Sequence, residues 1–221
     1  IAIAPFAILV VMKNVLALLA DWANGIFAVL LAATIVGIDP LWWHFIVGIV
    51  LAMSPDIDAV PELLARGKVG SSAEHMRDHR TFLHYPVISI PLGLLAWYLF
   101  GYWGLLWFMV LCLHLINDLY GTGWGLALLY PFSTRHYKFF TRRVNQTPLL
   151  LRETGTWHEL PVSEREVRVV TSWSHEELPS YIKKYGVDDW IKYWYLTINP
   201  TALIEYSLFM LAIILMSISL L

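Results

Sequence analysis

Long apolar runs alternate with polar segments along this chain. The runs cover roughly residues 2–20, 22–38, 41–54, 85–100, 103–120 and 202–221. A helix needs about 20 mainly apolar residues to cross a bilayer, so the pattern predicts an all-α, polytopic membrane protein with about six apolar helices. Asp39-Pro40 separates two of the runs, and because proline cannot continue a helix we expect a tight helical hairpin there. Gly101-Tyr102-Trp103-Gly104 predicts a second turn.

The polar stretch before the last run predicts a small separate region. Alternating residues at Glu166–Thr171 indicate a short strand or two, and the aromatic-rich stretch Trp190–Tyr195 indicates an interfacial helix. We therefore expect three regions. They are a membrane helical domain at 1–131 that carries the candidate site, a cytoplasmic loop or small subdomain at 132–200, and a C-terminal transmembrane helix at 201–221.

Composition supports the membrane assignment. Hydrophobic residues make up 58% of the chain and charged residues 14%, whereas soluble domains carry about a quarter charged residues. The formal net charge of -2 gives no sign of the concentrated basic surface that nucleic-acid binding needs. Membrane lipids are therefore the expected partners. The single cysteine, Cys112, excludes an internal disulfide and a thiolate-rich structural metal site.

The basic residues predict the orientation of the chain. Of 15 Lys and Arg residues, all except Lys13 fall in the segments 55–84 and 121–201. The positive-inside bias places both segments in the cytoplasm, and the hairpin 85–120 supplies the even number of crossings between them. Polar motifs at the ends of these segments should therefore meet at the cytoplasmic face of the membrane.

The first of these motifs is His114-Leu-Ile-Asn-Asp118, at the end of a long apolar run. Residues four apart on a helix share a face, so His114 and Asp118 can bind one cation or pair with each other. Ionisable residues inside membrane helices commonly serve a function. A hydrogen-bonded pair that only steadies helix packing remains the alternative for these two residues taken alone.

Two acidic residues follow another apolar run, where Asp56 and Asp58 come directly after Pro55. Like charges this close repel, and one would be driven to protonate unless a cation sits between them. The alternative is an ordinary solvated loop that ends a helix.

The third motif, His79-Arg-Thr-Phe-Leu-His84, directly precedes an apolar run. Imidazole and carboxylate ligands suit a catalytic zinc, or manganese or iron. Arg80, between the two histidines, could hold an anionic group such as phosphate through paired hydrogen bonds. An arginine that anchors a helix at the inner membrane boundary explains this residue equally well.

The predicted topology brings the three motifs to one membrane face. The candidate metal ligands are Asp56, Asp58, His79, His84, His114 and Asp118. They could hold one divalent ion with support from neighbouring residues, or two ions bridged by a carboxylate. In both cases the expected chemistry is hydrolysis by a metal-activated water, whose pKa falls to about 7 in the best case.

The three motifs, in this order and spacing, resemble those of the membrane-bound metal-dependent hydrolases of bacterial and archaeal inner membranes, some of them LexA-regulated. The resemblance covers roughly residues 22–143, and after the third motif it includes Gly125–Arg135. Two positions depart from the family pattern. Leu83 stands where a threonine is usual, and Asn24 is the nearest counterpart of a histidine that is usual in the first helix.

The resemblance implies a hydrolase in a prokaryotic inner membrane that cleaves a phosphoester or ester of a lipid-like or membrane-proximal substrate. The family is distantly similar to zinc-dependent phospholipases C and zinc nucleases, so zinc is the expected metal and the phosphoester follows by analogy. Asp58 and Arg80 would take part in catalysis, with Arg80 orienting the substrate anion and Thr122 in support.

The main alternative is a non-catalytic membrane scaffold subunit, a degenerate hydrolase that serves in a complex with partner subunits and holds a structural cation. The missing first-helix histidine fits this alternative. Transport ranks last, because the spans at 85–113 and 202–221 offer few polar residues besides Glu205.

Overall fold

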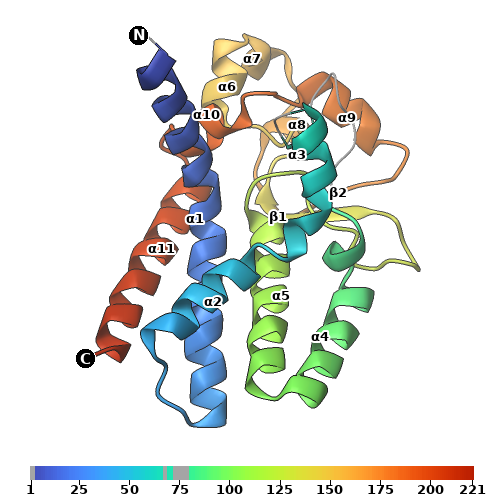
Figure 1. Ribbon diagram of the computed structural model, residues 1–221. Helices are drawn as coiled ribbons and strands as arrows, with labels where there is room; N and C mark the ends of the chain where they lie inside the picture. Colours follow the sequence, from blue (N-terminus) through green and yellow to red (C-terminus); the bar gives the residue numbers. More distant parts are fainter. Residues whose placement is uncertain (1–2, 67–68, 72–79) are drawn as a thin grey trace.

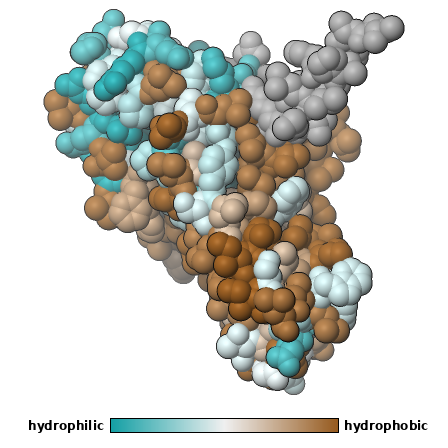
Figure 2. All heavy atoms as spheres, turned by 90° about the vertical axis from the view of Figure 1, so that its left-hand side faces the viewer, coloured by the Kyte–Doolittle hydropathy of each residue, from teal (hydrophilic) through white to brown (hydrophobic). Residues whose placement is uncertain are grey.

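The structure of the protein is a computed structural model that describes residues 3–66, 69–71 and 80–221. It is mostly helical. Long helices run together through one part of the molecule, and short helices with a small sheet lie at the opposite end (Figure 1). Apolar side chains gather over the long helices, whereas hydrophilic side chains gather at the other end (Figure 2).

The apolar runs form the long helices. Within the described residues these are α1 (Ile3–Val36), α2 (Trp42–Ala52), α4 (Pro86–Phe100), α5 (Tyr102–Tyr120) and α11 (Pro200–Ser219). Parts of α1, α5 and α11 are long and apolar enough to cross a membrane: Val15–Val36, Tyr102–Tyr120 and Pro200–Ser219. Together with Pro55–Arg66, α2 makes a fourth candidate span that is bent by 41°. By contrast, α4 has only 15 residues.

The expectation of six apolar helices is not confirmed, because the first two apolar runs form one continuous helix. Asp21 separates these runs in the sequence but lies inside α1. A polar side chain removes no backbone hydrogen bond, and aspartate lowers helix stability by less than about 0.7 kcal/mol. The two predicted hairpins are present: α1 ends at Val36 before α2 begins, and Gly101, with a φ of 56°, joins α4 to α5.

Glycines let the helices that carry the site approach closely. A Cβ atom on Gly25 of α1 would lie 2.6 Å from the carbonyl oxygen of Gly48 in α2, and a Cβ on Gly104 of α5 would collide with the backbone of Ala96 in α4. Membrane helices use small residues for this kind of contact. The buried core between α1, α2 and α5 includes Ile26 and Phe45.

Short helices link α2 to α4 and carry two of the three motifs. These are η1 (Pro55–Ala59), α3 (Val60–Arg66) and η2 (Phe82–His84). Proline at the first position of η1 suits a helix start, because its fixed φ is already helical and its missing N–H has no partner to lose there. This start turns the chain after α2, so that Asp56 of η1 reaches His114 in the last turns of α5.

The polar segment contains the predicted strands and the predicted interfacial helix. Strands β1 (His136–Thr141) and β2 (Arg168–Trp173) pair antiparallel, with His136 opposite Trp173. The short helices are α6 (Pro148–Glu153), α7 (Thr156–Glu159), α8 (Val162–Arg165), α9 (Leu178–Tyr185) and α10 (Trp190–Tyr195). Trp173 belongs to one small hydrophobic cluster of this segment, and Val144 belongs to another. The proposed division of the chain into three regions stays a prediction.

Candidate metal centre

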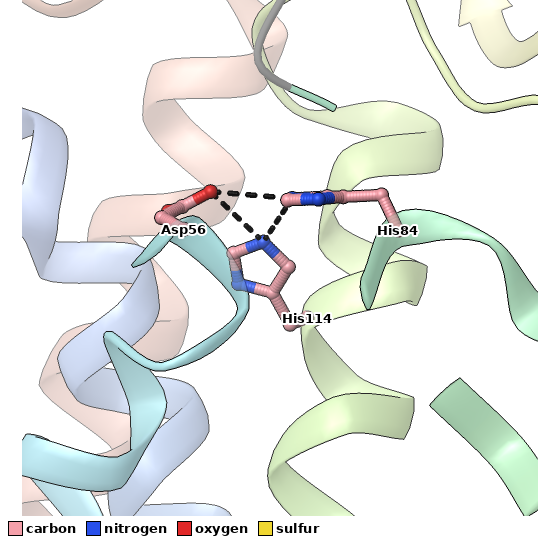
Figure 3. A group of neighbouring side chains, drawn as sticks. All are labelled: Asp56, His84 and His114. Carbon is pink, nitrogen blue, oxygen red and sulfur yellow. Dashed lines mark hydrogen bonds and ion pairs between the residues drawn. The ribbon is translucent and has the colours of Figure 1, made fainter. Parts of the chain in front are cut away.

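Three side chains from distant parts of the sequence meet at the end of the bundle that borders the polar assembly. Asp56 comes from η1, His84 from η2 and His114 from α5. Their side chains point toward one another (Figure 3). Asp56 Oδ1 lies 3.2 Å from His84 Nε2 and 3.5 Å from His114 Nε2, and the two imidazole nitrogens are 3.3 Å apart. These three atoms could hold one metal ion.

Asp118 lies beside this triad, one helical turn after His114. Its Oδ2 atom is 3.5 Å from Nε2 of both histidines and is buried without a hydrogen bond to the described residues. Its other oxygen, Oδ1, pairs with the guanidinium of Arg80 at 2.9 Å. The predicted spacing of His114 and Asp118 therefore brings both side chains to the same place, and Arg80 fixes the carboxylate of Asp118.

Asp58 contacts the far side of His84. Its Oδ2 atom accepts hydrogen bonds from the backbone N–H and the hydroxyl of Thr81, at 3.2 and 3.1 Å. The same atom lies 3.4 Å from His84 Nδ1, the ring nitrogen that faces away from the triad. In this arrangement Asp58 orients His84, and a ligand role for Asp58 stays a prediction.

Three predicted site residues remain, namely His79, Arg80 and Thr122. His79 lies outside the described residues. Arg80 also donates a hydrogen bond from Nη2 to the carbonyl oxygen of Thr122 at 3.3 Å. Its guanidinium lies against Gly123, where a Cβ would collide with it and where φ is +83°. Glycine at this position thus lets the loop after α5 close over Arg80.

A cavity of about 380 Å³ adjoins the triad, a size at the low end of small-molecule sites. Asp56, His114 and Asp118 line it, and so do Arg80 and Thr122. The remainder of the wall is largely apolar or aromatic and comes from α1, η1, α3 and α10. A ligand in this cavity would therefore reach the candidate metal atoms directly.

A family model described as YdjM inner membrane protein matches residues 20–178 of the chain. The chain belongs to the YdjM inner membrane protein family. No match was found among curated proteins or among solved structures. The family description and the apolar helices agree on a membrane protein of the inner membrane.

The matched segment of this YdjM-family chain contains the triad, Asp118 and Arg80. The family description names neither a metal nor a reaction. It thus supports the family of inner-membrane proteins, but not the predicted similarity to metal-dependent hydrolases and phospholipases C.

Sequence reasoning missed Asp21, which belongs to the site of this YdjM-family protein. Asp21 Oδ1 lies 3.1 Å from His114 Nδ1, and both side chains are buried. A carboxylate on the far nitrogen of a metal-binding histidine fixes its tautomer and orientation. The available signal was an acidic residue inside an apolar run, which in a membrane helix indicates a function. In the sequence, Asp21 falls between the apolar runs 2–20 and 22–38.

The carboxylates around His84 favour its charged form in the metal-free protein. Burial opposes protonation, but hydrogen bonds to Asp56 and Asp58 outweigh it and raise the pKa of His84 to about 9. His84 is therefore protonated at neutral pH unless a cation takes the place of the proton.

The donor atoms of the site fit a divalent cation. The carboxylates of Asp21, Asp56, Asp58 and Asp118 contact the two histidines, and Arg80 pairs with Asp118. Two imidazole nitrogens and a carboxylate oxygen suit zinc, or manganese or iron.

Proposed function

We propose that this protein is a membrane-bound metal-dependent hydrolase that acts on a phosphoester or ester of a lipid-like substrate. The observation that carries the proposal is the triad of Asp56, His84 and His114, whose donor atoms lie 3.2 to 3.5 Å apart beside a cavity. Three protein ligands next to an accessible space are typical of catalytic zinc sites, which keep one position for water or substrate.

The donor atoms of the triad favour zinc over magnesium. Two imidazole nitrogens and one carboxylate oxygen suit zinc, whereas magnesium prefers oxygen ligands.

The residues around the triad have separate tasks in this proposal. Zinc, when bound, lowers the pKa of a coordinated water to about 7 and so supplies the nucleophile. Asp21 and Asp58 orient His114 and His84 through their far nitrogens. Arg80 faces the cavity and neutralises negative charge on a substrate oxygen, in addition to holding Asp118.

The site would face the cytoplasm. The support is the charge distribution, since the triad borders the segments that hold all Lys and Arg residues except Lys13. The positive-inside bias assigns such segments to the cytoplasmic side. A cysteine-accessibility experiment on exposed positions of the polar segment would test this orientation separately from the chemistry.

A structural cation site is the second candidate, and Asp118 favours it. Its Oδ2 atom lies 3.5 Å from both imidazole nitrogens, so Asp118 could act as a fourth protein ligand and close the coordination shell. Structural zinc sites are closed in this way. A non-catalytic scaffold subunit would then bind zinc tightly and hydrolyse nothing.

One experiment tests both candidates. The protein is purified in lipid nanodiscs, its zinc content is measured by mass spectrometry, and hydrolysis of bis(p-nitrophenyl) phosphate and of a phospholipid is followed. If the protein is a hydrolase, the His84→Ala variant should lose both its bound zinc and its turnover. The matched control is His44→Ala, because His44 is also buried but stacks on Trp43 in α2. Zinc without turnover in the unaltered protein supports the structural site, and absence of zinc contradicts both candidates.

A further inference from the structure

The lining of the cavity next to the triad contains both ionisable and apolar side chains. Asp56, His114 and Arg80 contribute ionisable groups. Ala17 and Leu18 of α1 contribute apolar side chains, together with Ile57, Val60 and Leu63 of η1 and α3. A ligand that fills this space must therefore be amphipathic, with an oxygen-rich head at the candidate metal atoms and an apolar part along α1 and α3.

The apolar lining belongs to two candidate membrane spans. Ala17 and Leu18 fall within Val15–Val36, and Ile57, Val60 and Leu63 fall within Pro55–Arg66, which forms a bent candidate span together with α2. Asp21, which contacts the triad through His114, follows Ala17 one turn later. The apolar side of the cavity is therefore built from segments that are apolar enough to lie in a bilayer, and the triad lies beside them.

The apolar wall continues to the surface of the molecule. Ile57, Val60 and Leu63 follow one another at intervals of three residues, so they lie on one side of η1 and α3. All three line the cavity, and yet their exposed fractions are 65%, 45% and 49%. The cavity is therefore open along α3, which rises from η1 toward the polar end of the molecule (Figure 1).

The volume limits what fits inside. At about 30 Å³ for each group the size of a water molecule, 380 Å³ holds roughly 13 such groups. A phosphate head occupies about five of them, which leaves room for one alkyl chain of about eight carbons. Two complete acyl chains do not fit, so any further chain stays in the bilayer.

We propose that the cavity binds one alkyl chain of an amphiphile with a phosphate-type head, and that the amphiphile reaches the triad sideways from the membrane along α3. This inference rests on the proposed function and specifies its substrate class. The same head-group chemistry is present in soluble phosphate compounds. The alkyl chain, rather than the head group, therefore distinguishes a membrane ligand from a soluble one.

Alkylphosphonates provide a test that does not depend on turnover, because their carbon–phosphorus bond is not hydrolysed. Binding of inorganic phosphate and of methyl-, butyl-, octyl- and dodecylphosphonate to the zinc-loaded protein in nanodiscs is measured by calorimetry, with empty nanodiscs as the blank. Each methylene that enters the cavity should tighten binding roughly fourfold. The gain should stop near eight carbons, because the cavity is then full.

Two tryptophan substitutions on α3 test where the alkyl chain of the ligand lies. Leu63→Trp narrows the opening along α3 and should weaken octylphosphonate binding while leaving phosphate binding unchanged. Leu64→Trp is the matched control, because Leu64 is adjacent and exposed but does not line the cavity. Both positions are exposed, so both variants should keep the melting temperature of the unaltered protein.

The results separate this inference from the proposed function. Equal affinity for phosphate and octylphosphonate, or equal weakening by the two tryptophan variants, overturns the inference even if the protein hydrolyses soluble esters. Chain-dependent binding that Leu63→Trp alone weakens supports it even if no hydrolysis is found, in which case only the proposed function fails.

Discussion

Replacing Asp21 with asparagine removes the negative charge that faces His114 while it keeps the shape of the side chain. Asp21 Oδ1 lies 3.1 Å from His114 Nδ1 in a buried contact, so no water can take over its role. Carboxylate partners of metal-binding histidines typically contribute 10- to 100-fold to metal affinity. We therefore expect Asp21→Asn to raise the zinc Kd by roughly 10- to 100-fold, or about 1.4–2.7 kcal/mol of binding free energy.

A competition titration against a chromophoric chelator, with the protein in nanodiscs, measures this change. The control is Asp39→Asn, the same substitution at an exposed position just after α1. Its zinc affinity should equal that of the unaltered protein, and the metal-free forms of both variants should still be folded by circular dichroism. If Asp21→Asn binds zinc as tightly as Asp39→Asn does, Asp21 does not act through a metal-bound His114 and our argument is refuted.

Three further predictions concern pH, a buried lysine and a helix contact. Because the pKa of His84 is raised to about 9, zinc must displace a proton below this pH, and zinc affinity should fall roughly tenfold per pH unit between pH 9 and 6.5. The contacts that raise this pKa also stabilise the folded metal-free protein. Their contribution is fully present below pH 6.5 and is lost as the pH rises through 9, so the melting temperature of the metal-free protein should fall between pH 6.5 and 9. The fully buried Lys138 donates hydrogen bonds to the carbonyl oxygen of Gly123 and to Asn145 Oδ1, at 2.7 and 2.8 Å. Lys138→Met should therefore lower the free energy of unfolding by about 2–3 kcal/mol. An unchanged denaturation midpoint would show that these bonds contribute nothing to stability. Gly104→Leu should cost about 1–3 kcal/mol through overpacking between α4 and α5. Thermal unfolding in nanodiscs can check this against Tyr98→Leu, a substitution at an exposed position of α4.

The topology that brings the triad together was largely predictable from the sequence. Asp56, His84 and His114 each lie at an end of an apolar segment, and an even number of crossings between charged segments puts such ends on one face. The spacing of His114 and Asp118 also predicted a shared helix face, which the structure has. Local patterns were sufficient because the membrane restricts where helix ends can lie.

Other features depend on tertiary contacts that no local pattern reveals. The role of Asp21 depends on its contact with His114, which is 93 residues away in the sequence. The position of Asp58 on the far nitrogen of His84 depends on its hydrogen bonds to Thr81. The close contact of Gly25 with Gly48 has the same origin, since a glycine in an apolar run does not indicate which helix approaches it.

X-ray absorption at the zinc edge is the most direct test of the central claim that Asp56, His84 and His114 share one ion. For the zinc-loaded protein we expect two imidazole nitrogens together with oxygen ligands at about 2.0–2.1 Å, and no sulfur. His84→Ala and His114→Ala should each retain one imidazole ligand or lose the ion. A protein that binds no zinc, or a spectrum that neither histidine substitution changes, would contradict the account.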